Sequence, residues 1–178
     1  NLTILNHLAK YYEVTDQYKL ASDILDDASE VARLKYDNLD PEFAIENDQI
    51  ASLQIKVGEY EKAEANINAA LKILDEYRKD EARLPAYVHA LETQAKLFAI
   101  KGMFDEAESN LERSSKIIRK SEVEIAGDIS SAEELSALYI LLGKFGSAQD
   151  IIEEQIPEFE KLFGRQSLRL IEPLVHHG

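Results

Sequence analysis

The chain has 178 residues, of which 45% are hydrophobic and 30% charged, and its formal net charge is -14. It can bury a core, but so acidic a surface argues against a nucleic-acid partner, which needs concentrated basic residues. The absence of cysteine excludes disulfides, thiolate metal sites and cysteine nucleophiles. No apolar run reaches the roughly 18 residues of a membrane helix and no signal peptide is visible, so we expect no membrane contact and a cytoplasmic location.

Helical apolar spacing predicts four pairs of helices in chain order. The expected ranges are 2–14 with 17–36, 41–57 with 60–80, 85–101 with 104–120, and 122–142 with 145–163. Pro41 and Pro85 stand where helices should begin, which suits a first helical turn, and Asp40 is the expected N-cap before Pro41. Pro157 falls inside the last helix and is expected to kink or break it.

A short pattern recurs between the two helices of every pair. A turn residue is followed two places later by an aromatic residue and five places later by alanine. The four instances are Asp16/Tyr18/Ala21, Gly58/Tyr60/Ala63, Gly102/Phe104/Ala107 and Gly143/Phe145/Ala148. The alanines are 42, 44 and 41 residues apart, which indicates tandem repeats of about 42 residues.

Three further columns align on the same register. A small residue lies seven places before the turn, a branched aliphatic nine places after it, and a small residue twelve places after it in three of the copies. These columns are Ala9, Ala51, Ala95, Ser136; Leu25, Ile67, Leu111, Ile152; and Ala28, Ala70, Ser114, with Gln155 departing from the pattern. Glycine permits a tight reversal at the end of a helix, and small residues let two helices approach closely. The aromatic and the branched aliphatic residues are expected to fill the space between the two helices. Each unit is therefore a helical hairpin that must stack on its neighbours to bury its apolar face.

The segments LQIKVGEYEKAEANINAALKIL and AKLFAIKGMFDEAESNLERSSKII resemble the tetratricopeptide repeat (TPR). The usual period is about 34 residues, and the longer period here resembles the subclass found in kinesin light chains and in many bacterial regulatory proteins. The resemblance implies an all-α, right-handed solenoid forming a single domain. Its repeats would be 2–40, 41–83, 84–121 and 122–164, with a partial fifth at 165–178 that indicates a fragment of a longer protein.

Candidate catalytic residues are better interpreted structurally. His176 and His177 are adjacent on an expected helix, so their side chains point about 100° apart and do not converge on one ion. His7 and His89 have no carboxylate cluster at ligand spacing and are expected to line the groove or the surface. The carboxylate pairs Asp26-Asp27, Glu133-Glu134 and Glu153-Glu154 suit a solvated acidic face, and helix packing explains most tyrosines. Neither a metal nor a cofactor is expected, and the chain is not expected to be an enzyme.

The concave groove of such a solenoid is lined by the first helix of each hairpin. Three columns should face it, at ten, six and three residues before each turn. They are Asn6, Asp48, Glu92, Glu133; Lys10, Ser52, Lys96, Ala137; and Glu13, Ile55, Ala99, Ile140. Because carboxylates outnumber lysines here, the groove favours a basic or mixed, partly apolar protein or peptide.

These observations predict a protein- or peptide-binding scaffold. The alternative, drawn from the same resemblance, is a regulatory segment of a larger bacterial enzyme such as a caspase-like peptidase, a histidine kinase or a transcriptional regulator. Self-association is a further possibility, because a truncated fifth repeat would expose an apolar face around Leu168, Ile171 and Leu174.

Overall fold

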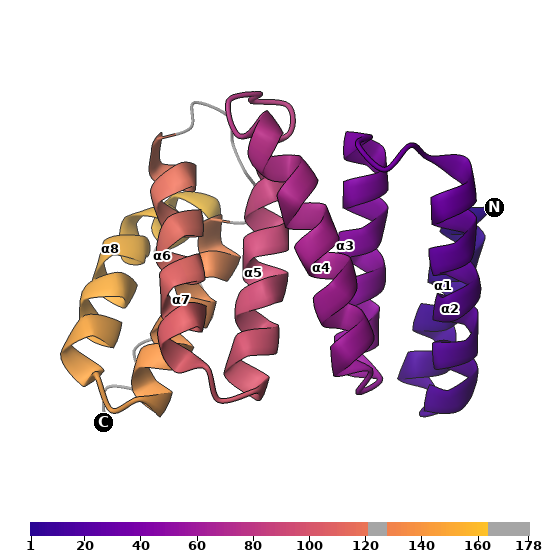
Figure 1. The fold of residues 1–178 in the computed structure, drawn as a ribbon. Coiled ribbons are helices and arrows are strands. Elements are labelled where there is room, and N and C mark those ends of the chain that lie inside the picture. The colour runs from indigo at the N-terminus through magenta and orange to yellow at the C-terminus, as the bar shows by residue number, and fades with distance from the viewer. Residues whose placement is uncertain (121–127, 164–178) are drawn as a thin grey trace.

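The computed structural model describes residues 1–120 and 128–163, with positions 119–120, 128–134, 155 and 157–163 described by their backbone alone. Within these residues the chain forms helices and turns, without strands. The α-helices are α1 (Leu2–Val14), α2 (Tyr18–Lys35), α3 (Pro41–Lys56), α4 (Tyr60–Leu74), α5 (Leu84–Ile100), α6 (Phe104–Lys120), α7 (Asp128–Leu141) and α8 (Phe145–Phe163). Figure 1 shows them following one another in chain order from the N-terminal side to the opposite end.

The helices pair as hairpins that stack into a solenoid. Each helix packs most extensively on its hairpin partner, and each hairpin then packs on the next through α2 with α3, α4 with α5 and α6 with α7. The first helices of consecutive hairpins also touch one another, α1 on α3 and α3 on α5. The predicted all-α solenoid of helical hairpins is confirmed. The predicted partial fifth repeat lies outside the described residues.

The turn column has one backbone conformation in all four hairpins. Gly58, Gly102 and Gly143 have φ of 84°, 75° and 70°, and Asp16 has φ of 57°. The amide of each turn residue donates to the carbonyl three residues earlier, and the next amide donates to the carbonyl five residues before it. This double hydrogen bond is the Schellman motif, which ends a helix with a left-handed residue and satisfies its last carbonyls.

The small-residue columns lie in the core. Ala9, Ala51 and Ala95 are at most 1% exposed, and Ala21, Ala63 and Ala107 are fully buried. Their size lets the two helices of a hairpin come close together, while larger aliphatic side chains such as Ile67 fill the space between them. The sequence register therefore identified the packing surface of each hairpin.

The aromatic column is less buried than the sequence suggested. Tyr60 and Phe104 are half-buried, but Tyr18 is 47% exposed and Phe145 is 67% exposed. The hydroxyl of Tyr18 donates to Oδ1 of Asp16 at 2.7 Å, so this ring lies beside its own turn. The prediction that these aromatics fill the core is wrong for the first and last hairpins.

Two helix boundaries also differ from the sequence prediction. The second helix of the second hairpin ends at Leu74 and continues as a short 3-10 helix (Asp75–Tyr77), not as an α-helix to residue 80. Pro157 does not break α8, which continues to Phe163. Proline removes one intrahelical hydrogen bond, but its fixed φ of about -65° is compatible with a helical backbone. The predicted helix starts at Pro41 and Pro85 are confirmed, and the Asp40 side chain caps α3 by accepting from the Glu42 amide at 2.9 Å.

Candidate functional site

The candidate site is the surface formed by the first helices of the hairpins, here called the A-helix face. Its innermost column, ten residues before each turn, was expected to be open to a partner. In the structure Asn6, Asp48 and Glu92 are only 8%, 4% and 4% exposed. Glu133 belongs to α7, but its side chain lies outside the described residues. The described members of this column are therefore buried between neighbouring hairpins.

Asn6 joins the first hairpin to the second. Its Nδ2 donates to Oε2 of Glu46 at 3.1 Å and to Oε1 of Gln49 at 3.4 Å, both on α3. Burial raises the pKa of Glu46 above its ordinary value, and the hydrogen bond from Asn6 opposes that rise. A buried amide that bridges two helices fixes their spacing, because an alternative packing would leave it without partners.

Asp48 joins the second hairpin to the third. Its Oδ2 pairs with Nδ1 of His89 on α5, and the Asp48 side chain is 5% exposed whereas the His89 side chain is 55% exposed. The hydrogen bond and charge of Asp48 raise the pKa of His89 against the opposing effect of desolvation; Glu92 adds to the rise and Lys96 reduces it. Oδ1 of Asp48 is buried and accepts no hydrogen bond from the described part of the protein.

The sequence reasoning placed Asp48 and His89 separately and missed this contact. The spacing could have indicated the contact, because side chains on the first helices of consecutive hairpins meet at sequence separations of 40, 41 and 43 residues. A search for opposite charges at a spacing near one repeat would have paired them.

The outer two columns form the accessible part of the A-helix face. Lys10, Lys96 and Ala137 are exposed, and Ser52 is half-buried. The column nearest the turns, formed by Glu13, Ile55, Ala99 and Ile140, is half-buried throughout. The surface offered to a partner is thus a mixture of lysine, small and aliphatic side chains above a layer of buried polar groups.

A second set of contacts ties each hairpin to the turn of the next. At each of the three described junctions between hairpins, the side chain six places after one turn residue forms a hydrogen bond with a side chain next to the turn residue of the following hairpin. The pairs are Ser22 with Glu59 at 2.7 Å, Glu64 with Lys101 at 2.7 Å, and Glu108 with Lys144 at 2.6 Å. Their periodicity shows that acidic residues on the second helices serve stacking as well as solvation.

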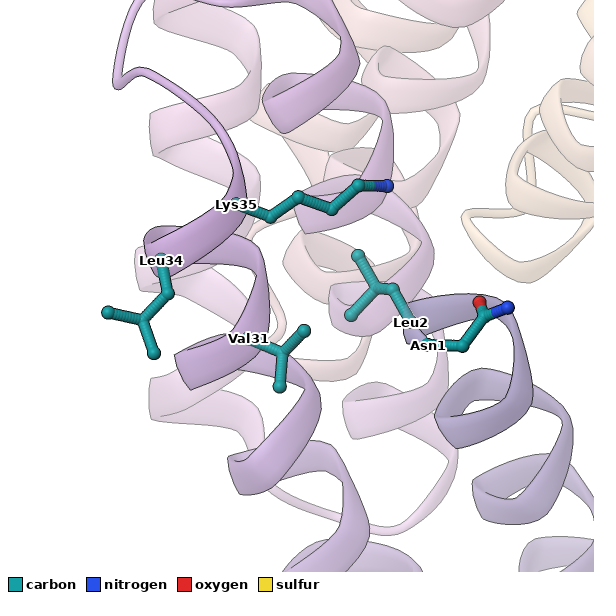
Figure 2. Close-up of a pocket in the computed structure, with 5 residues that line it drawn as sticks. All are labelled: Asn1, Leu2, Val31, Leu34 and Lys35. Carbon is teal, nitrogen blue, oxygen red and sulfur yellow. The ribbon is translucent and has the colours of Figure 1, made fainter.

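Two hollows lie where a hairpin opens away from its turn. The first, of about 460 Å³, is lined by Asn1, Leu2, Val31, Leu34 and Lys35. Figure 2 shows Leu2 and Val31 beside the space between α1 and α2, with Lys35 above them and Leu34 directed outward. Asn1 occupies the register position that Phe43 and Tyr87 fill in the next two hairpins, where both rings are buried. A small side chain in place of a ring explains this hollow.

The second hollow lies beside α5 and α6 and is more polar. It measures about 670 Å³, and its lining includes Arg78, Lys79, Arg113 and Lys116 together with Glu81 and Glu112. Arg113 donates to Asp75 at 2.8 Å and lies 5.1 Å from the centre of the Tyr87 ring. Tyr87 in turn donates to Asp75 at 2.7 Å. Arg113 thus links α6 to the 3-10 helix and to α5, whereas Arg78 and Lys116 form local ion pairs with Asp75 and Glu112.

The remaining histidines and carboxylate pairs were candidates for metal binding or catalysis. Within the described ranges, no group of three or more histidine or acidic side chains could hold a metal ion, and no helix could cross a membrane. Asp26, Asp27, Glu153 and Glu154 are exposed, and Asp26 pairs with Lys62 at 2.7 Å. His176 and His177, like the side chains of Glu133 and Glu134, lie outside the described residues.

Comparison with known proteins identifies the fold. No protein-family model and no curated protein matches the sequence. Two crystal structures described as a kinesin light chain with nearly identical TPR-like repeats from Podosopora anserina match 97% of this chain and 81% of theirs, at 17% identity, with TM-scores of 0.81 and 0.80.

The crystal structure of BtubC (BKLC) from P. vanneervenii is also similar, with 25% identity and a TM-score of 0.64 over 89% of this chain and 62% of that one. The chain therefore has the TPR-like solenoid fold of these kinesin-light-chain repeats, as the sequence motifs predicted. This fold is typical of protein-interaction scaffolds.

Proposed function

We propose that this chain is a protein-binding scaffold that holds a segment of a partner protein against the A-helix face and has no catalytic activity of its own. The observation that carries the proposal is the layering of this face. Buried polar contacts link α1 to α3 and α3 to α5, while the outer columns remain accessible above them. A rigid, repeated surface of this kind is suited to an extended partner, because each hairpin offers the same positions to successive partner residues.

The partner that fits best is basic or mixed and partly apolar. Half-buried Ile55 and Ile140 provide apolar contact, and Ser52 and Ala137 leave space for a partner side chain. The carboxylates of Asp48 and Glu92 lie just beneath this surface, and the chain carries a net charge of -14. The net negative charge attracts a cationic partner at long range, whereas the exposed Lys10 and Lys96 of the outer columns would pair with acidic residues of a mixed one.

The burial of Asp48 and Glu92 changes how the proposal has to be tested. Charge reversal at these positions would disturb the packing between hairpins, so a loss of binding would not identify the binding surface. Accessible positions avoid this problem. Ala137→Arg and Ser52→Arg place a long cation on the A-helix face, whereas Ala65→Arg places the same side chain on an exposed site of α4.

The assay is fluorescence anisotropy with labelled peptides that range from basic through mixed to acidic. We expect the natural chain to bind basic and mixed peptides more tightly than acidic ones. Ala137→Arg and Ser52→Arg should weaken binding about tenfold, equivalent to roughly 1.4 kcal/mol, and Ala65→Arg should leave it unchanged. Equal losses in all three variants, or a preference for acidic peptides, would contradict the proposal.

A further inference from the structure

The contact between Asp48 and His89 is an asymmetric ion pair at the junction of the second and third hairpins. The carboxylate side is 5% exposed and the imidazole side is 55% exposed. Solvent can therefore exchange a proton with the histidine while the carboxylate stays enclosed. His89 is the hydrogen-bond partner that the described residues supply to the Asp48 side chain, whose second oxygen is buried without one.

Few other charges act on the imidazole. Asp48 approaches it from α3, and Glu92 and Lys96 lie on α5 itself. The helices α4 and α6 also pack on α5, but none of their described side chains is among the groups that shift the pKa of His89. The protonation state of His89 thus depends chiefly on the buried carboxylate that it covers.

We propose that Asp48 and His89 form a proton-dependent clasp that locks α3 against α5 when the imidazole is protonated and loosens when it is neutral. In the protonated state an imidazolium neutralises the buried carboxylate across the junction. In the neutral state one ordinary hydrogen bond remains, and the charge of Asp48 stays buried without a counter-ion. A buried carboxylate without its partner is strongly unfavourable, so the two helices shift to let water reach it.

The direction of the pH effect follows from the geometry and agrees with the raised pKa of His89. A group whose folded pKa is raised stabilises the fold fully below its unfolded pKa, which is near 6.5 for histidine. That stabilisation is lost as the pH rises through the folded pKa. Since Asp48 and Glu92 belong to the A-helix face, the clasp would set the shape of that face; this consequence for binding rests on the proposed function, whereas the clasp itself does not.

The first test measures the titration and the stability without any partner. NMR titration should give His89 a pKa above its ordinary value, and Asp48→Asn should lower its proton affinity at least threefold, or about half a pKa unit. The midpoint of urea unfolding should be higher near pH 6 than near pH 8.5. His89→Gln keeps an amide that can donate but cannot become charged, so it should remove most of this difference. The matched control His7→Gln changes an exposed histidine on α1 and should preserve it.

The second test follows the two helices directly. The chain has no cysteine of its own, so Lys56→Cys and Ile100→Cys place spin labels only at the exposed last turns of α3 and α5. The distance distribution should broaden or shift from about pH 6 to about pH 8.5, and His89→Gln should show the broadened form at both values. An ordinary or lowered pKa for His89, or distributions and unfolding midpoints that ignore pH, would overturn the clasp. These readouts need no ligand, so a failed search for a binding peptide would leave their result intact.

Discussion

The left-handed turn residues allow a sharp test of how the hairpins are closed. Gly102 has φ of +75°, and a Cβ atom placed on it would meet no heavy atom within 4 Å. Replacing it with alanine therefore introduces backbone strain without a steric clash. The perturbation isolates the conformational preference of one residue at the end of α5.

The size of the effect can be worked out from two opposing contributions. A left-handed conformation costs a residue with a Cβ about 1–2 kcal/mol. Alanine also makes the unfolded chain less flexible than glycine does, and this stabilises the folded state by about 0.4–1 kcal/mol. Gly102→Ala should therefore destabilise the chain by up to about 1.6 kcal/mol, or lower its Tm by up to a few degrees at about 2–4 °C per kcal/mol.

Gly146 is the matched control for Gly102. It lies in the first turn of α8, its φ is not positive, and an added Cβ would again meet nothing within 4 Å. Gly146→Ala should stabilise the chain, by up to about 1 kcal/mol, because alanine is the better helix former. Urea unfolding followed by circular dichroism should show midpoints moving in opposite directions for the two variants. If both moved the same way, backbone conformation would not be what selects glycine in the turns.

Two further predictions concern a helix cap and a buried tyrosine. Asp40→Ala removes the cap of α3 and should destabilise the chain by about 1 kcal/mol in urea unfolding, whereas Asp40→Asn, which can still cap, should cost much less. Burial and the hydrogen bond to Asp75 raise the pKa of Tyr87 to about 12 from 10.0, so the stability due to its phenol is present below pH 10.0 and is lost as the pH rises toward 12. Tyr87→Phe should therefore be less stable than the natural chain near pH 9, and the gap should narrow near pH 11; a gap independent of pH would show that the phenol is not the cause.

The hairpins and their turns could be predicted from the sequence because their causes are local. Positive φ at Gly58 and Gly102 follows from the need to reverse the chain within a few residues, and the buried alanines follow from the close approach of the two helices. Asp16 entered the same column because aspartate tolerates the left-handed region better than most residues with a side chain. Such constraints repeat in every unit, so four copies reveal them without any knowledge of the stacking.

Exposure depends on the stacking, and for this reason it was harder to predict. Tyr18 and Tyr60 occupy the same column, yet Tyr18 is 47% exposed and Tyr60 is half-buried. The burial of a side chain in a solenoid depends on the neighbouring hairpins, and within the described residues the first hairpin packs on one neighbour whereas the second packs on two. A repeat column therefore predicts toward which side of the hairpin a side chain points, but not how exposed that side chain is.

Stacking also determines the exposure of the A-helix face. Helical spacing correctly grouped Asn6, Asp48 and Glu92 in one column, but it could not show that adjacent first helices pack closely enough to bury that column. Buried polar side chains need partners, and here Asn6 and Asp48 find them one repeat away, on α3 and α5. The sequence suggested that these polar side chains bind a ligand. In the structure they first hold successive hairpins in register. A partner would therefore contact mainly the outer columns, whose lysine, small and aliphatic side chains are the positions at which binding is to be tested.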